Sequence, residues 1–119
     1  MADLADTPTR GIPKSVDSFE LANASAVVYT VPAGTATEVK QIALTNTGAA
    51  AVTATIHRCP NGAAEGNSNM LEKAINVPSD GKALVLNYDG LYMNATDTLE
   101  AFASAANQVT CHISIMEWS

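Results

Sequence analysis

The chain has 119 residues and a formal net charge of −6, from 12 acidic and 6 basic residues. Hydrophobic residues make up 47% of it, but 21 residues are alanine, and Val, Ile, Leu and Phe together number only 25. This composition predicts one small domain with a thin core and leaves little room for a nucleotide-binding α/β domain. The acidic balance and the scattered Lys and Arg predict no binding to nucleic acid or to an anionic membrane surface.

Residues 1–25 differ from the rest of the chain. They combine prolines, a glycine and charges of both signs with isolated apolar residues that follow no sustained period. We therefore predict an extended N-terminal arm over residues 1–25 and a folded domain over residues 26–119. The start of the chain has neither a basic region nor an apolar stretch typical of a secretory signal, and no apolar run reaches the ~20 residues of a membrane span. The candidate anchors of the arm are Leu4, Ile12, Val16, Phe19 and Leu21.

From residue 26 onward, the pattern predicts short β-strands separated by turns. Apolar and hydroxyl side chains alternate, most clearly over residues 109–115, and Gly, Pro, Asn and Asp mark the turns between them. This spacing predicts an all-β antiparallel β-sandwich of seven or eight short strands, of jelly-roll type, with the N-terminal arm outside it. The strands are predicted over residues 26–31, 37–45, 52–57, 70–77, 83–88, 99–103 and 109–115.

The two histidines and two cysteines are the first candidates for a metal site. His57 and Cys59 would share one face of a strand, but the adjacent Cys111 and His112 would point to opposite faces. The short ligand spacings of a zinc module are absent. We therefore predict no metal site, a reduced Cys111 in the core, and exposed histidines on strand faces.

The acidic residues that could act in catalysis stand in or beside turns. We expect Asp80, Asp89, Asp97 and Glu100 to be solvated turn residues. No nucleophile elbow and no phosphate-binding glycine loop occurs in the sequence. These observations predict a protein that is not an enzyme and that holds no cofactor.

Two tyrosines could form a small platform for a sugar. Tyr88 and Tyr92 flank the predicted turn at Asp89 and Gly90, where exposed rings would stack on a glycan. Packing against the core is the more common role for such rings. A carbohydrate-binding module that uses these two tyrosines is therefore an alternative interpretation of the chain.

Several phrases of the sequence resemble small β-sandwich virion proteins of tailed bacteriophages. They are Val-Tyr-Thr-Val-Pro-Ala-Gly over 28–34, Ile-Ala-Leu-Thr-Asn-Thr-Gly over 42–48, Asp-Thr-Leu-Glu-Ala over 97–101 and Val-Thr-Cys-His-Ile-Ser-Ile-Met-Glu over 109–117. The resemblance covers about residues 26–117. It implies a non-enzymatic virion structural protein, foremost a capsid decoration or cement protein that binds and stabilises the particle surface.

The same resemblance implies the partners and the location. The protein is expected in the virion, assembled in the host cytoplasm, bound to the major capsid protein or to other virion proteins. A homo-oligomer is expected, with a trimer favoured, in which the arm crosses adjacent subunits and its five anchors fill their pockets. The alternatives are a head–tail connector, a tail or fibre accessory protein, and the carbohydrate-binding module.

Overall fold

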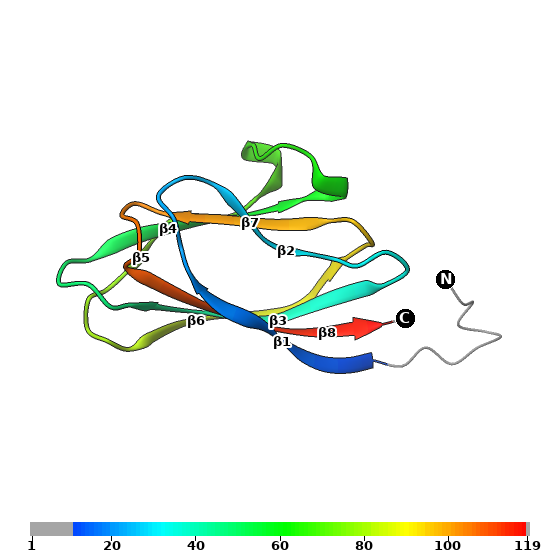
Figure 1. Cartoon of the computed structure of the whole chain (residues 1–119), viewed down its shortest axis with the longest axis horizontal. Helices are drawn as coiled ribbons and strands as arrows, with labels where there is room; N and C mark the ends of the chain where they lie inside the picture. The colour runs from blue at the N-terminus through cyan, green and yellow to red at the C-terminus, as the bar shows by residue number, and fades with distance from the viewer. Residues whose placement is uncertain (1–10, 119) are drawn as a thin grey trace.

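The computed structural model describes residues 11–118, with Asp17 and Asp89 described by their backbone alone. Two four-stranded sheets pack face to face, as the edge-on view of Figure 1 shows. Two short 3-10 turns, Pro60–Gly62 and Asn67–Asn69, lie in the loop between the fourth and fifth strands. The strands are β1 (Gly11–Glu20), β2 (Ala26–Thr30), β3 (Ala36–Asn46), β4 (Val52–Cys59), β5 (Met70–Val77), β6 (Ala83–Met93), β7 (Thr98–Ala103) and β8 (Val109–Trp118).

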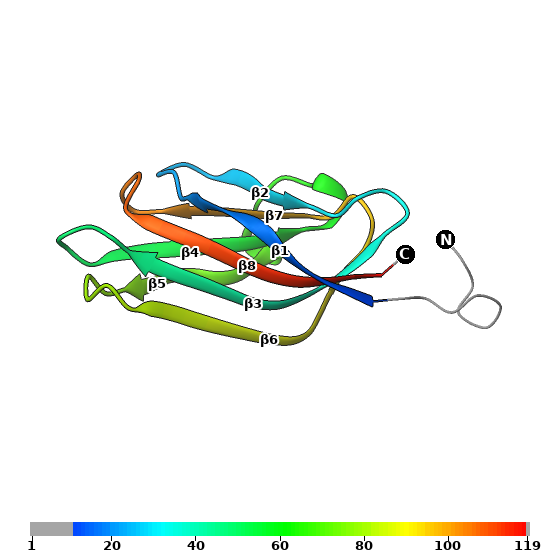
Figure 2. The same cartoon turned by 60° about the horizontal axis from the view of Figure 1, so that its bottom comes forward.

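The strand order confirms the predicted sandwich and gives its topology. One sheet, here called the β8 sheet, has the order β1-β8-β3-β6, and Figure 2 shows these four strands side by side. The other, the β7 sheet, has the order β2-β7-β4-β5, and every pairing is antiparallel. Because most connections cross from one sheet to the other, this is the eight-strand arrangement of a jelly roll.

The sandwich begins earlier than the sequence pattern predicted. Residues 11–20, expected as part of an arm, form β1 and pair with β8 from Gly11 opposite Trp118 to Glu20 opposite Thr110. The register shifts between Val16 and Phe19, so the strand is bulged there. This bulge breaks the two-residue alternation, which is why the pattern did not reveal a strand. Residues 1–10 lie outside the described part of the chain.

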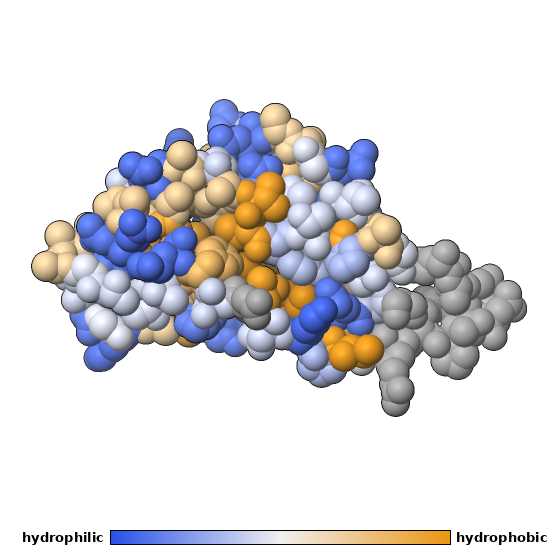
Figure 3. Space-filling model, viewed as in Figure 1, coloured by the Kyte–Doolittle hydropathy of each residue, from blue (hydrophilic) through white to orange (hydrophobic). Residues whose placement is uncertain are grey.

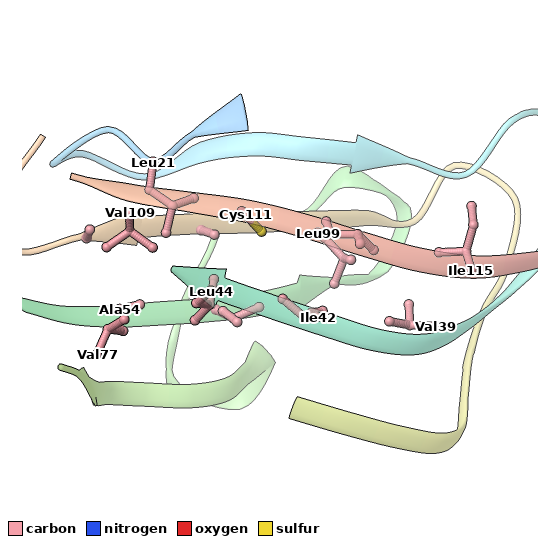
Figure 4. Packing of buried hydrophobic residues seen from close by; sticks show 14 of the residues in the cluster. Leu21, Val39, Ile42, Leu44, Ala54, Val77, Leu99, Val109, Cys111 and Ile115 are labelled. Carbon is pink, nitrogen blue, oxygen red and sulfur yellow. The ribbon is translucent and has the colours of Figure 1, made fainter. Parts of the chain in front are cut away.

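The core fills the space between the two sheets. The inward row of β8 is buried as predicted, and Leu44 of β3 lies in the same layer with similar burial (Figure 4). Ile56 of β4 is likewise only 2% exposed. Ala54, Ala101 and Ala103 are also buried, at 4% exposure or less. Alanine side chains bury little apolar area, so this core is thin and the sheets need additional ties. The buried row of β8 consists of Val109, Cys111, Ile113 and Ile115.

Two tyrosine hydroxyls tie the sheets together, one at each open side of the sandwich. The Tyr29 hydroxyl of β2 donates to Glu117 Oε2 of β8 at 2.8 Å and lies 2.8 Å from Thr37 Oγ1. On the other side, the Tyr88 hydroxyl of β6 donates to Glu72 Oε2 of β5 at 2.7 Å. Burial, together with Glu117, raises the pKa of Tyr29 to about 12. Burial and Glu72 likewise raise the pKa of Tyr88, so both phenols remain hydrogen-bond donors at neutral pH.

A buried carboxylate organises one end of the sandwich. Asp97 is 4% exposed, and its Oδ1 accepts the backbone N–H of Asn61 at 2.8 Å. Its Oδ2 accepts the N–H of Asn94 at 2.9 Å and faces the Arg58 guanidinium at 3.5 Å. The Asp97 carbonyl accepts the N–H of Val31 at 2.9 Å. The prediction of a solvated turn acid was wrong here, because this side chain binds its own turn, the distant loop after β4 and Arg58 of β4.

A buried amide has a similar role at the opposite end of β3. Asn46, 1% exposed, donates from Nδ2 to the carbonyls of Ala50 at 2.8 Å and of Val77 at 3.1 Å. Its Oδ1 accepts the N–H of Gly48 at 2.8 Å. The predicted turn after β3 is therefore held to the end of β5 by one side chain.

The predicted turn at residues 89–90 is a bulge within β6. Val39 pairs with Leu91 and Gln41 with Asn87, so β6 contains two more residues than β3 over this stretch. Gly90 has φ +86, a conformation that favours glycine. The strand therefore continues to Met93 instead of ending near Tyr88.

We predict that Asp97→Ala lowers the free energy of unfolding by about 3 kcal/mol, because it removes a buried carboxylate that accepts backbone N–H groups of two loops and faces Arg58. Asp80→Ala is the matched control. Asp80 is exposed, its Oδ1 accepts only the N–H of Lys82, and we expect a loss below about 1 kcal/mol. Urea unfolding of both variants measures the difference; equal losses would contradict the role given to Asp97.

Candidate functional site

The predicted arm anchors divide into two groups in the structure. Leu21 is 1% exposed and belongs to the core of this chain. Val16 and Phe19 are partly buried and pack against the same core. These three side chains are therefore occupied within the subunit, whereas Ile12 is 52% exposed. Leu4 lies outside the described residues.

The exposed apolar residues near β1 and β2 form one surface. Val27 of β2 is 55% exposed, and a groove of about 250 Å³ runs between Phe19–Ala22 and Ala26–Val28 with Ala101 beside it. Figure 3 shows hydrophobic residues gathered in the middle of this side of the molecule. We call this surface the β1–β2 strip, and it consists of Val16, Phe19, Val27 and Val28.

Both strands of the strip are edge strands. Within residues 11–118, β1 is hydrogen-bonded only to β8 and β2 only to β7. Edge strands in soluble proteins are commonly blunted by charged residues, prolines or bulges. The sequence of β2 is Ala-Val-Val-Tyr-Thr, with no charge and no proline, and only a register shift between Val27 and Tyr29 protects it. The outer edge of β2 is therefore available for pairing with another strand.

Polar groups close one end of the strip. The Lys14 ammonium lies 3.3 Å from Glu117 Oε1, and the same carboxylate accepts the Tyr29 hydroxyl through its other oxygen. Lys14 is largely exposed, and Glu117 is mostly buried. Such a pair contributes little to stability, but it sets a charged boundary beside an apolar surface.

The two tyrosines of the predicted sugar platform do not lie together. Tyr88 is partly buried against the core and bonded to Glu72, whereas Tyr92 is 60% exposed. The bulge at Gly90 shifts the alternation of side chains between the two faces of β6. Tyr88 therefore faces inward, whereas Tyr92 faces outward. This structure therefore does not form the platform expected from these residues; the side chain of Asp89, between them, lies outside the description.

The histidines and cysteines are placed partly as predicted. Cys111 is buried in the core and His112 points outward, which confirms their opposite faces. His57 and Cys59 share the outer row of β4, opposite Glu100 and Thr98 of β7. His57 is nevertheless 4% exposed, so its predicted exposure was wrong. The loop after β4 folds over it and brings Glu65 Oε2 to 3.7 Å from its Nδ1.

Both cysteines are protonated thiols in a buried setting. Burial and the Glu100 carboxylate raise the pKa of Cys59 to about 11, and burial alone raises that of Cys111 to about 12. Neither is in a disulfide. In the described part of the chain, no three His, Cys, Asp or Glu side chains gather in a group that could hold a metal ion. A helix long and apolar enough to cross a membrane is also absent from residues 11–118.

Comparison with known proteins finds a likeness of fold to a solved structure. No protein-family model matches the chain, and a search of curated proteins finds no match. A solved structure from Bacillus endospore appendages, described as a novel family of disulfide-linked pili, aligns with a TM-score of 0.56 and 15% identity. The alignment covers 100% of this chain and 96% of that chain. At this identity the likeness shows a shared fold.

We predict that the protein loses stability above pH 9 through its buried thiols. The pKa of Cys111 is raised from 9.0 to about 12. The full contribution of this thiol to the free energy of unfolding is therefore present below pH 9. It falls between pH 9 and pH 12, where the unfolded chain releases the proton and the folded chain keeps it, by about 1.4 kcal/mol per pH unit. Urea unfolding at pH 8, 9 and 10 under reducing conditions measures this slope. Cys111→Val removes one titrating thiol and should therefore reduce the slope of the free energy of unfolding against pH. An unchanged slope would contradict the role given to Cys111.

Proposed function

We propose that the protein is a non-enzymatic structural subunit of a larger particle, which it joins through the β1–β2 strip. The phrases that resemble phage virion proteins support a capsid decoration or cement protein as the particular role. The partner would be the major capsid protein, and the subunits would meet as a homo-oligomer, with a trimer favoured.

The observation that carries this proposal is the combination of an apolar surface with the open edge of β2. Val27 is more than half exposed beside a groove that is also lined by Leu21 and Ala101 of the core. Exposed apolar patches mark contact sites in soluble proteins. An unpaired edge adds backbone N–H and C=O groups that a strand from another chain can satisfy. Together they fit a protein partner better than a small substrate.

The structural neighbour supports a role in assembly, although its disulfide linkage differs from the contacts that we propose for this chain. Its appendages are described as disulfide-linked pili, which indicates that a sandwich of this fold can serve as a subunit of a polymer. In the present chain both cysteines are buried, Cys59 at 0% and Cys111 at 2% exposure. A disulfide between folded subunits would require them at the surface. We therefore propose that the contacts of this subunit are non-covalent.

We expect Val27→Lys to weaken binding to capsids assembled without the protein by more than tenfold, because it places a charge where the partner must exclude water. The substitution leaves the core intact, since the Val27 side chain is exposed. Co-sedimentation with such capsids and light scattering of the free protein measure binding and oligomer mass.

Val85→Lys is the matched control, because Val85 is 42% exposed on β6, away from the strip. We expect it to bind as the wild type does. Undiminished binding by Val27→Lys, or an equal loss in both variants, would contradict the proposed surface.

A further inference from the structure

A second groove lies on the outer face of the β7 sheet and is separate from the β1–β2 strip. It has a volume of about 500 Å³ and runs across β4, β5 and β7. The loop between β4 and β5 closes one end of it, and Figure 1 shows this loop, in green, rising above the upper layer. The volume is within the range of small-ligand sites.

A bulge in β5 shapes one wall of the groove. Ala54 of β4 pairs with Ile75, but Ile56 pairs with Glu72, so β5 has one extra residue. Consequently the consecutive residues Lys73 and Ala74 both line the groove. Ala74 has φ +48, which costs roughly 1 kcal/mol for a residue other than glycine, and its N–H donates to Thr55 Oγ1 at 3.1 Å.

His57 lies in the floor of the groove with an unpaired nitrogen. Its side chain is 5% exposed, and Nδ1 has no hydrogen-bond partner among the described residues. The nearest carboxylate, Glu65 Oε2, is 3.7 Å away, beyond hydrogen-bond distance, and the Glu65 side chain is 42% exposed. A buried polar atom without a partner is costly. Among the described residues, Nδ1 of His57 therefore stays unsatisfied beneath the groove.

The remaining polar groups offer both donors and acceptors. Thr55 Oγ1 and Ser104 Oγ each accept a backbone N–H, from Ala74 and Thr53 respectively, and each keeps its own O–H to donate. Lys73 donates, whereas the Glu65 carboxylate accepts. One basic and one acidic side chain balance in charge, so the groove does not select for an ion.

Phe102 provides an apolar surface between these polar groups. It stands opposite Thr55 on the outer face and lines the groove. A pyranose ring matches this arrangement, because it has a flat face of C–H groups and a rim of hydroxyls that both donate and accept. We propose that this groove binds a short neutral glycan, with the sugar face on Phe102 and its hydroxyls toward Thr55, Ser104 and Glu65.

The proposal is tested with an array of neutral mono- to tetrasaccharides, followed by calorimetric titration of the best binder. Phe102→Ala should reduce the affinity by at least tenfold. Glu65→Ala, which changes a half-exposed loop side chain and leaves the sheets untouched, should also reduce it by severalfold. Tyr92→Ala, on the other sheet, should bind as the wild type does.

Two results would overturn the proposal. In the first, the wild type binds no arrayed sugar up to about 10 mM. In the second, Tyr92→Ala loses affinity for the sugar and Phe102→Ala does not. If Phe102→Ala fails to fold, unchanged binding by Glu65→Ala overturns it. The result is independent of the proposed assembly role, because the groove and the β1–β2 strip share no lining residue and glycan binding is measured without capsids.

Discussion

The buried carboxylate of Asp97 is the contact on which the arrangement of the loops depends. Through its side chain and backbone it joins the crossing after β2, the loop after β4 and the turn after β6. A core with several alanines supplies limited apolar burial, so these hydrogen bonds decide where the strands cross between sheets. By holding Asn61, Asp97 also positions the start of the loop that covers His57. Asp97 therefore supports both the fold and the loop that borders the groove.

The two open sides of the sandwich are closed by the same chemistry but have different surroundings. Tyr88 and Glu72 tie β6 to β5, and Tyr29 and Glu117 tie β2 to β8. Only the second tie stands beside the β1–β2 strip, where edge strands of both sheets meet. The structure thus separates a side suited to protein contacts from the outer face of the β7 sheet, where the groove lies. A particle subunit could use both surfaces at once.

The sequence predicted most of the strands. Seven predicted strands over residues 26–115 correspond to β2 through β8, because apolar and β-branched residues gather between turn residues, even where β2 and β5 are bulged. The failures occur at bulges. The bulge between Val16 and Phe19 concealed β1, and the bulge at Gly90 resembled a turn and reversed the direction of Tyr92. The burial of Asp97 and His57 was not predictable from local pattern, since distant loops cover them.

Hydrogen exchange of the β2 backbone tests the central claim most directly. The account predicts that amides of Ala26–Thr30 exchange at least tenfold more slowly when the protein is bound to its particle than when it is free. Protection would arise because a partner covers the strip and satisfies the open edge. Unchanged exchange in β2, with slowing confined to the outer strand β6, would contradict the account and place the interface on the other side of the sandwich.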